Sequence, residues 1–180
     1  GSNRGYEWAY AARNSLFIAI FATLIATTLG TLAAVGLSRP QMPYRKPIMA
    51  LLISPLIVPI IIIAAGMFFF YSHIGLAYTH LGVILAHAVM GTPYVVITVT
   101  ATLIGFDETL IRASGSLGAK PLRTFFRVIM PLITPGVISG ALFAFITSFD
   151  EVVLIYFLAD AEQKTIPIQM WSGLRQQISP

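Results

Sequence analysis

Long apolar runs separated by short polar segments dominate the sequence. The four runs extend from Asn14 to Leu37, from Pro47 to Tyr71, from Leu81 to Gly105 and from Leu132 to Ala159. A helix needs about 20 residues to cross an apolar layer about 30 Å thick, because each residue advances about 1.5 Å. Each run is long enough, and the pattern therefore predicts four membrane-spanning helices.

The runs are too long for membrane β-strands, which need only about 10 residues, and they lack a period of two. We therefore expect an all-α membrane bundle that forms one domain over residues 1–180. Composition agrees, because 57% of the residues are hydrophobic and 10% are charged, whereas soluble domains carry about a quarter charged residues. This excludes an ordinary soluble globular domain.

The positive charges lie in two of the segments between the runs. Arg39, Arg45 and Lys46 follow the first run, and Arg112, Lys120, Arg123 and Arg127 lie between the third and the fourth. Loops rich in Lys and Arg face the cytoplasm, which predicts that both chain ends lie on the outer side. The net charge of +4 is thus explained by the orientation of the chain in the membrane, and we expect no nucleic-acid partner.

Little in the sequence suggests catalysis or metal binding. The chain has no cysteine, so it offers no thiolate ligand or nucleophile. Of the three histidines, His80 and His87 are two helical turns apart, which is too far to share one ion, and His73 flanks an outer loop. We expect structural roles for all three, and no spacing specifies a catalytic triad.

Proline and glycine interrupt three of the four runs. They occur at Pro55 and Pro59, at Gly91-Thr92-Pro93 and at Pro135-Gly136. Each proline removes a backbone donor. In a membrane the freed carbonyls are satisfied by neighbouring helices or by a watery pathway, and the sequence leaves open whether these are kinks or pathway elements.

The segment from Asp107 to Pro131 predicts a helix, a turn and a second helix. Asp107 and Glu108 suit the positive end of a helix dipole. An expected partner-binding face contains Leu110, Ala113, Ser114 and Leu117. Gly118 is expected to stop the first helix in a left-handed conformation, and Pro131 to end the second. The pattern alone leaves open whether this unit binds a protein or lies among lipid headgroups.

This segment resembles the cytoplasmic loop of permeases of binding-protein-dependent ABC importers. The shared motifs are Ala113-Ser114, Leu117-Gly118-Ala119 and Pro131-Leu132. Arg112 occupies the position where the family usually has a glutamate. Ser148–Glu151 and Met170–Gly173 resemble the polyamine branch. Such permeases usually have six spans, and the four runs resemble the second to the fifth. We therefore expect this chain, which begins at Gly1, to be truncated.

The resemblance implies an inner-membrane subunit of a bacterium or archaeon that forms a solute path and is not an enzyme. Expected partners are ATPase subunits, a second permease, identical or not, and an extracytoplasmic binding protein. ATP and Mg²⁺ would bind the ATPase, and no phosphate loop occurs here. The coupling residues would be Leu110, Arg112, Ala113, Ser114, Leu117, Gly118, Ala119 and Pro131. The expected cargo is a polyamine, with an iron complex, thiamine or a small anion as alternatives.

Asp150 and Glu151 lie in the fourth run, where a charge near the membrane centre costs about 2.5–3.5 kcal/mol. We expect them to line a cavity or lie at the outer interface, where one of them and Ser148 would attract a cationic solute. The alternative is that they cap or anchor the helix. An intramembrane hydrolase using these acids and a purely structural bundle are the remaining function classes.

Overall fold

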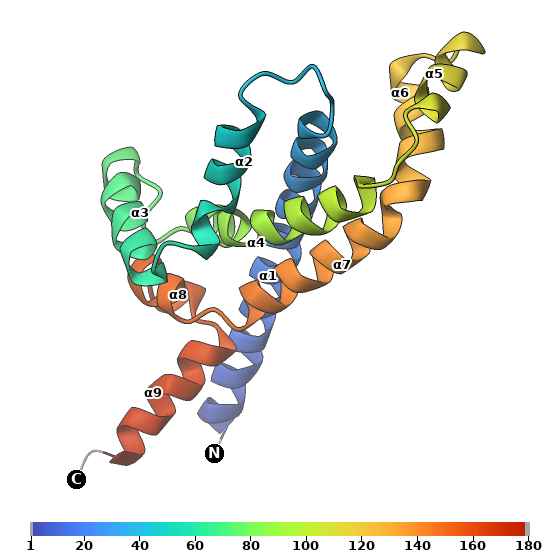
Figure 1. The fold of residues 1–180 in the computed structure, drawn as a ribbon. Helices are drawn as coiled ribbons and strands as arrows, with labels where there is room; N and C mark the ends of the chain where they lie inside the picture. The colour runs from blue at the N-terminus through green and yellow to red at the C-terminus, as the bar shows by residue number, and fades with distance from the viewer. Residues whose placement is uncertain (1, 179–180) are drawn as a thin grey trace.

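The computed structural model describes residues 2–178, and within this range the chain is helical and contains no strand (Figure 1). The helices are α1 (Ser2–Leu37), α2 (Arg45–Ile53), α3 (Ile60–Ile74), α4 (His80–Leu103), α5 (Thr109–Ser116), α6 (Pro121–Thr124), α7 (Met130–Phe149), α8 (Val153–Leu158) and α9 (Ile166–Ile178). Short 3-10 turns lie at Ser54–Leu56 and Ala161–Gln163, and a π-helical turn at Phe125–Ile129. The predicted all-α class is confirmed.

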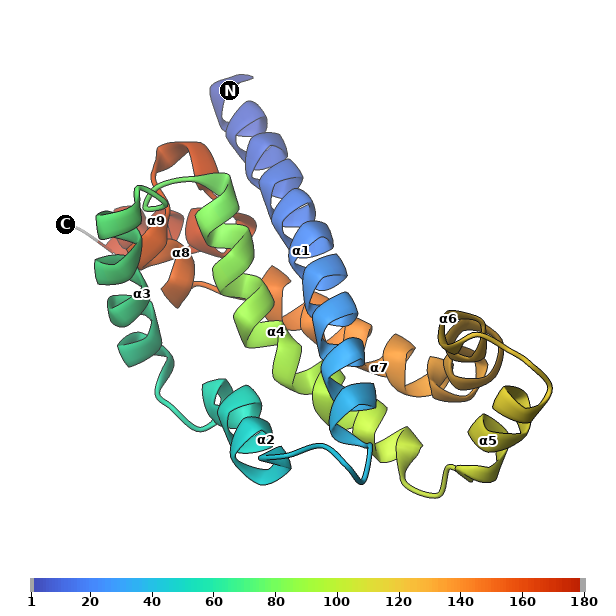
Figure 2. The ribbon, with the colours of Figure 1, turned by 90° about the horizontal axis from the view of Figure 1, so that it is seen from above.

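Helices α1, α4 and α7 form the centre of the bundle (Figure 2). Small residues allow their backbones to approach: a Cβ added at Gly91 would lie 2.9 Å from the Cβ of Ala144 and 3.3 Å from that of Ala26. One turn further along, a Cβ at Gly30 would lie 2.7 Å from the Cβ of Val95. Because neighbouring contacts progress in the same direction, α1 and α4 run parallel, held by the small-residue packing common between membrane helices.

The second apolar run is broken rather than continuous. The helix Arg45–Leu56 and the helix Ile60–Ile74 meet at an angle of 102°. Pro59 lies at the break in an extended conformation, with φ −54° and ψ 130°. Its ring also disfavours a helical conformation at Val58, the residue before it. Pro93 and Pro135 do not end their helices, and α4 and α7 continue through both.

The fourth run begins earlier and ends earlier than predicted. One apolar helix extends from Pro121 to Phe149, so the prediction that Pro131 ends the second helix of the cytoplasmic segment is wrong. Pro131 lies in the first turn of α7, directly after the π-helical turn, where the missing N–H is tolerated. At the other end the helix stops at Phe149, and the chain resumes as α8 after a break.

Both termini lie at the same end of the molecule (Figure 1). The Nδ2 atom of Asn14 donates to the carbonyls of Glu162 and Lys164, at 2.8 and 3.0 Å. The backbone N–H of Ile166 donates to Oγ of Ser15 at 2.9 Å. These bonds join the start of α1 to the segment before α9, which agrees with the expected placement of both ends on one side of the membrane.

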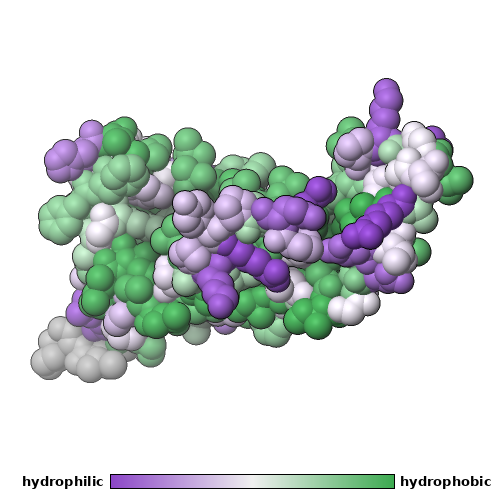
Figure 3. Space-filling view, turned by 45° about the horizontal axis from the view of Figure 1, so that its top comes forward, coloured by the Kyte–Doolittle hydropathy of each residue, from purple (hydrophilic) through white to green (hydrophobic). Residues whose placement is uncertain are grey.

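Three helices are long and apolar enough to cross a membrane within the described residues, or four if the bent pair counts as one span. The surface agrees, because apolar side chains cover much of the face shown in Figure 3. The apolar residues Leu24, Leu29, Ile62 and Leu142 are all more than half exposed. Such a surface suits a lipid environment.

Candidate functional site

The elbow is formed by α5, the Gly118 turn and α6, and it projects from the bundle at the end opposite to the termini (Figure 1). Gly118 has φ 80°, which confirms the predicted left-handed stop. The N–H of Ala119 donates to the carbonyl of Ser114 at 3.1 Å, closing the end of α5. A Cβ at Gly118 would meet nothing within 4 Å, so the backbone conformation alone requires glycine here.

Two further hydrogen bonds fix the shape of the elbow. The hydroxyls of Ser114 and Thr124 lie 2.9 Å apart and join α5 to α6. At the start of α5, the N–H of Thr109 donates to Oδ1 of Asp107 at 2.8 Å. The hydrogen bonds from Thr109 hold the pKa of the Asp107 carboxyl below its ordinary value, so this side chain caps the helix as a carboxylate.

The elbow exposes apolar side chains on both of its arms. Leu117 is 87% exposed and Leu122 is 71% exposed, and Leu110, Ala113 and Phe126 are exposed as well. The prediction that Ser114 lies on this face is wrong. Its hydroxyl is turned to Thr124 inside the elbow. The face therefore extends from α5 across the turn to α6 and the π-helical turn.

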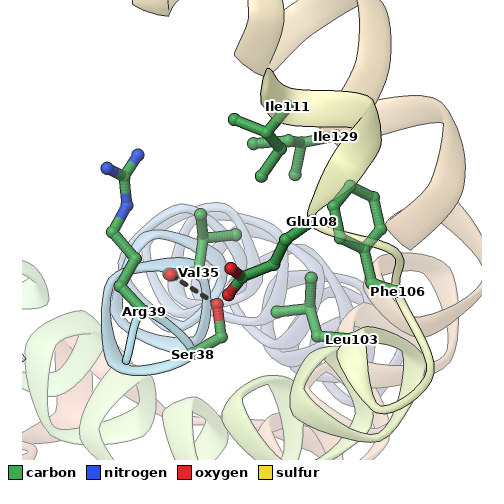
Figure 4. Close-up of a pocket in the computed structure, with 8 residues that line it drawn as sticks. All are labelled: Val35, Ser38, Arg39, Leu103, Phe106, Glu108, Ile111 and Ile129. Carbon is green, nitrogen blue, oxygen red and sulfur yellow. Dashed lines mark hydrogen bonds between the residues drawn. The ribbon is translucent and has the colours of Figure 1, made fainter. Parts of the chain in front are cut away.

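A small cavity of about 70 Å³ lies where α5 meets the bundle (Figure 4). Its lining residues come from α1, α4, α5, the π-helical turn and the segments beside them: Val35, Ser38, Arg39, Leu103, Phe106, Glu108, Ile111 and Ile129. Figure 4 shows the Glu108 carboxylate directed toward Ser38. Ile111 packs against the core that contains Ile129. The contact that Ile111 makes between α5 and the bundle was not predicted from the sequence.

Arg112 lies on the bundle side of the elbow. It lines a second hollow together with Arg39, Pro40, Gln41, Glu108 and Ile111. Arg112, which occupies the position where the family usually has glutamate, therefore lies near Glu108 and the loop after α1. It is not part of the exposed apolar face.

The two acids of the fourth run occupy the break between α7 and α8 and have different roles. Oε1 of Glu151 accepts hydrogen bonds from the N–H groups of Val153 and Leu154, at 2.7 and 3.2 Å, and so caps α8. Asp150 ends α7 and its side chain is exposed. The carboxylate of Asp150 is therefore the more exposed of the two.

Ser148 is the penultimate residue of α7 and is buried. Its Oγ is 2.7 Å from Nδ1 of His87, and the two side chains are 6% and 2% exposed. His73 and His80 lie elsewhere: Nδ1 of His73 is 2.9 Å from the carbonyl of Phe69, and the ring of His80 packs edge-on to Phe17. In the part of the chain that the structure describes, no three His, Asp or Glu side chains come together as metal ligands.

Residues 9–179 match the model of the family described as binding-protein-dependent transport system inner membrane component. Among similar proteins is the spermidine/putrescine transport system permease protein PotC of Haemophilus influenzae, 30% identical over 170 residues that cover 94% of this chain and 66% of that protein. The putrescine transport system permease protein PotI of Escherichia coli K12 is 32% identical over 175 residues, which cover 92% of this chain and 62% of PotI.

The chain spans just under two thirds of the length of these relatives. A solved structure has the same fold with a TM-score of 0.76 at 19% identity: a bacterial ABC transporter involved in the import of the acidic polysaccharide alginate. The match covers 96% of this chain and 59% of that one. It supports the arrangement of helices described above.

Proposed function

The chain belongs to the family of binding-protein-dependent transport system inner membrane components, and on this premise we propose that it forms part of the solute path of an ATP-driven importer. The family consists of membrane components of transport systems and not of enzymes. The solute would pass by alternating access, and a separate ATPase subunit that binds ATP and Mg²⁺ would supply the energy.

The elbow is the observation that carries this proposal. Leu117 is almost fully exposed at the tip of a rigid turn, and Leu110 and Leu122 flank it. Burying apolar area contributes about 25 cal/mol per Å², so a partner that covers this face gains stability. The partner that we propose is the ATPase subunit. The elbow would enter a groove of this subunit, with Gly118 and Ala119 forming the bend.

The cargo that we propose is a polyamine. The names of the relatives support it, and so does the exposed carboxylate of Asp150, which attracts cations. Glu151 is engaged with the start of α8, so we assign solute contact to Asp150. The hydroxyl of Ser148 is buried against His87, so we assign no direct solute contact to Ser148 in this conformation. An iron complex, thiamine or a small anion would be alternative cargoes.

The remaining partners follow from the same proposal. A second permease, identical or related, would complete the path, and an extracytoplasmic binding protein would deliver solute to the end where the two termini lie. The exposed apolar surface described above would then be shared between lipid and the second permease.

Reconstitution of the full-length permease with its ATPase and binding-protein partners tests the proposal. We expect polyamine to stimulate ATP hydrolysis, and Leu117→Asp to abolish both ATPase association and the stimulation. Leu174→Asp is the matched control, because Leu174 is exposed on α9 at the opposite end, and it should retain both. ATPase association that survives Leu117→Asp, or hydrolysis that no polyamine stimulates, would contradict the proposal.

A further inference from the structure

A hollow of about 500 Å³ lies between the N-terminal half of α1 and the start of α4, lined by Arg13, Asn14, Phe17 and His80. It is at the end opposite to the elbow and is separate from the acidic break. We propose that it binds the phosphate of an anionic phospholipid in the outer leaflet of the membrane. The inference does not depend on the cargo or on the ATPase.

Two sources of positive potential and one further hydrogen-bonding group meet at the hollow. Arg13 is exposed and contributes a guanidinium group, and His80 contributes an imidazole. His80 is also the first residue of the 24-residue helix α4, so the positive end of the helix dipole is directed to the same place. None of the four lining residues is acidic, and the hollow therefore favours an anion.

The groups around the hollow are held in place. Asn14 is buried, and its Nδ2 donates to the backbone carbonyls of Glu162 and Lys164. The guanidinium carbon of Arg13 lies 5.0 Å from the centre of the Tyr10 ring. Such a cation–π contact suits the headgroup level of a membrane, where aromatic rings anchor helices.

An exposed apolar face of α1 continues from the hollow toward the membrane centre. At spacings of three and four residues from Arg13 it presents Phe17, Ile20, Phe21 and Leu24, which are 44–58% exposed. The rings of Phe17 and Phe21 pack together with centroids 4.7 Å apart. A free phosphate would make no use of this face, whereas acyl chains would lie along it below a bound headgroup.

Photocrosslinking in nanodiscs tests the proposal with the full-length permease in its complex. The probe is phosphatidylglycerol that carries a photoreactive group near the glycerol, diluted in phosphatidylcholine. We expect adducts on residues 13–21, located by mass spectrometry. Arg13→Gln should lower the yield about fivefold, the effect of roughly 1 kcal/mol per charge near a membrane surface. His80→Phe should lower the yield less, through the loss of a hydrogen-bonding group, and Arg13→Lys should retain most of it.

Arg175→Gln is the matched control, because Arg175 is an exposed arginine on α9 at the same end, and its yield should stay unchanged. An equal loss in Arg13→Gln and Arg175→Gln would show unspecific attraction and overturn the proposal. Competition by excess inorganic phosphate would assign the hollow to a free anion, and adducts absent from residues 13–21 would show that another segment covers it. The Lys variant keeps the test valid should a Gln variant fail to assemble.

Discussion

His87 and Ser148 are 61 positions apart in the sequence, and their side chains meet at 2.7 Å across the interface of α4 and α7. Nε2 of His87 is buried and has no hydrogen-bond partner among the described residues. The Gly91–Ala144 contact lies one turn further into the bundle. A buried polar pair therefore lies beside the small residues that bring α4 and α7 together.

Ser148→Ala should lower the stability of the full-length permease by about 1–3 kcal/mol, because both ring nitrogens of the buried His87 would then lack a partner. Thermal unfolding in detergent measures the change. Ser172→Ala is the control: its hydroxyl bonds within the same helix to the carbonyl of Gln169, and its loss should change little. Equal shifts in the two variants would refute a special role for the His87 contact.

Gly140→Ala should also be destabilising, by about 1–3 kcal/mol from overpacking. A Cβ at Gly140 would lie 2.7 Å from the Cα of Val95 and 2.5 Å from Oγ1 of Thr98, so the backbones of α4 and α7 would have to separate. Gly66→Ala provides the comparison, since a Cβ there meets nothing within 4 Å. Unfolding temperatures in detergent should separate the two variants, and an unchanged Gly140→Ala would be evidence against the tight packing.

Gly118→Ala should weaken ATPase association while leaving the membrane bundle folded. The left-handed conformation costs a residue with a side chain roughly 1–2 kcal/mol, which favours reshaping of the elbow. Gly115→Ala introduces the same methyl group within α5, where nothing lies within 4 Å, and should retain binding. Pull-down of the ATPase by each detergent-purified variant measures the difference, and equal binding would contradict the proposed bend.

Asp150→Asn should lower polyamine uptake in proteoliposomes more than Glu151→Gln does. The first substitution removes an exposed charge, whereas the second keeps an oxygen that can accept from the N–H groups of Val153 and Leu154. Unfolding temperatures show whether either variant is merely unstable. A larger loss of uptake in Glu151→Gln, with both variants stable, would reverse the assignment of the solute contact.

The fold class and the shape of the elbow could be predicted because their causes are local. Long apolar runs demand helices in a membrane, and Gly118 marks a left-handed turn without reference to the rest of the chain. The face around Leu117 follows in part from the same helical periodicity. The inward turn of Ser114 could not be predicted, because it depends on Thr124 in the other arm.

The breaks in the helices show the opposite case. Pro59 lies in a break and directly precedes α3, whereas Pro93 and Pro135 lie inside helices. The residue type is the same, and the outcome depends on how neighbouring helices pack against each segment, which the residue type does not reveal. The end of α7 at Phe149 could not be predicted either, because the apolar pattern continues unchanged after Asp150 and Glu151.

The uninterrupted helix from Pro121 to Phe149 has a mechanical consequence. With 29 residues it is about 44 Å long, with an arm of the elbow at one end and Asp150 at the other. Tilting such a lever by about 5° moves its far tip by roughly 4 Å, about the width of a methylene chain. A modest rocking motion at the inner surface is thus magnified into a displacement large enough to open or shut a passage for a slender molecule.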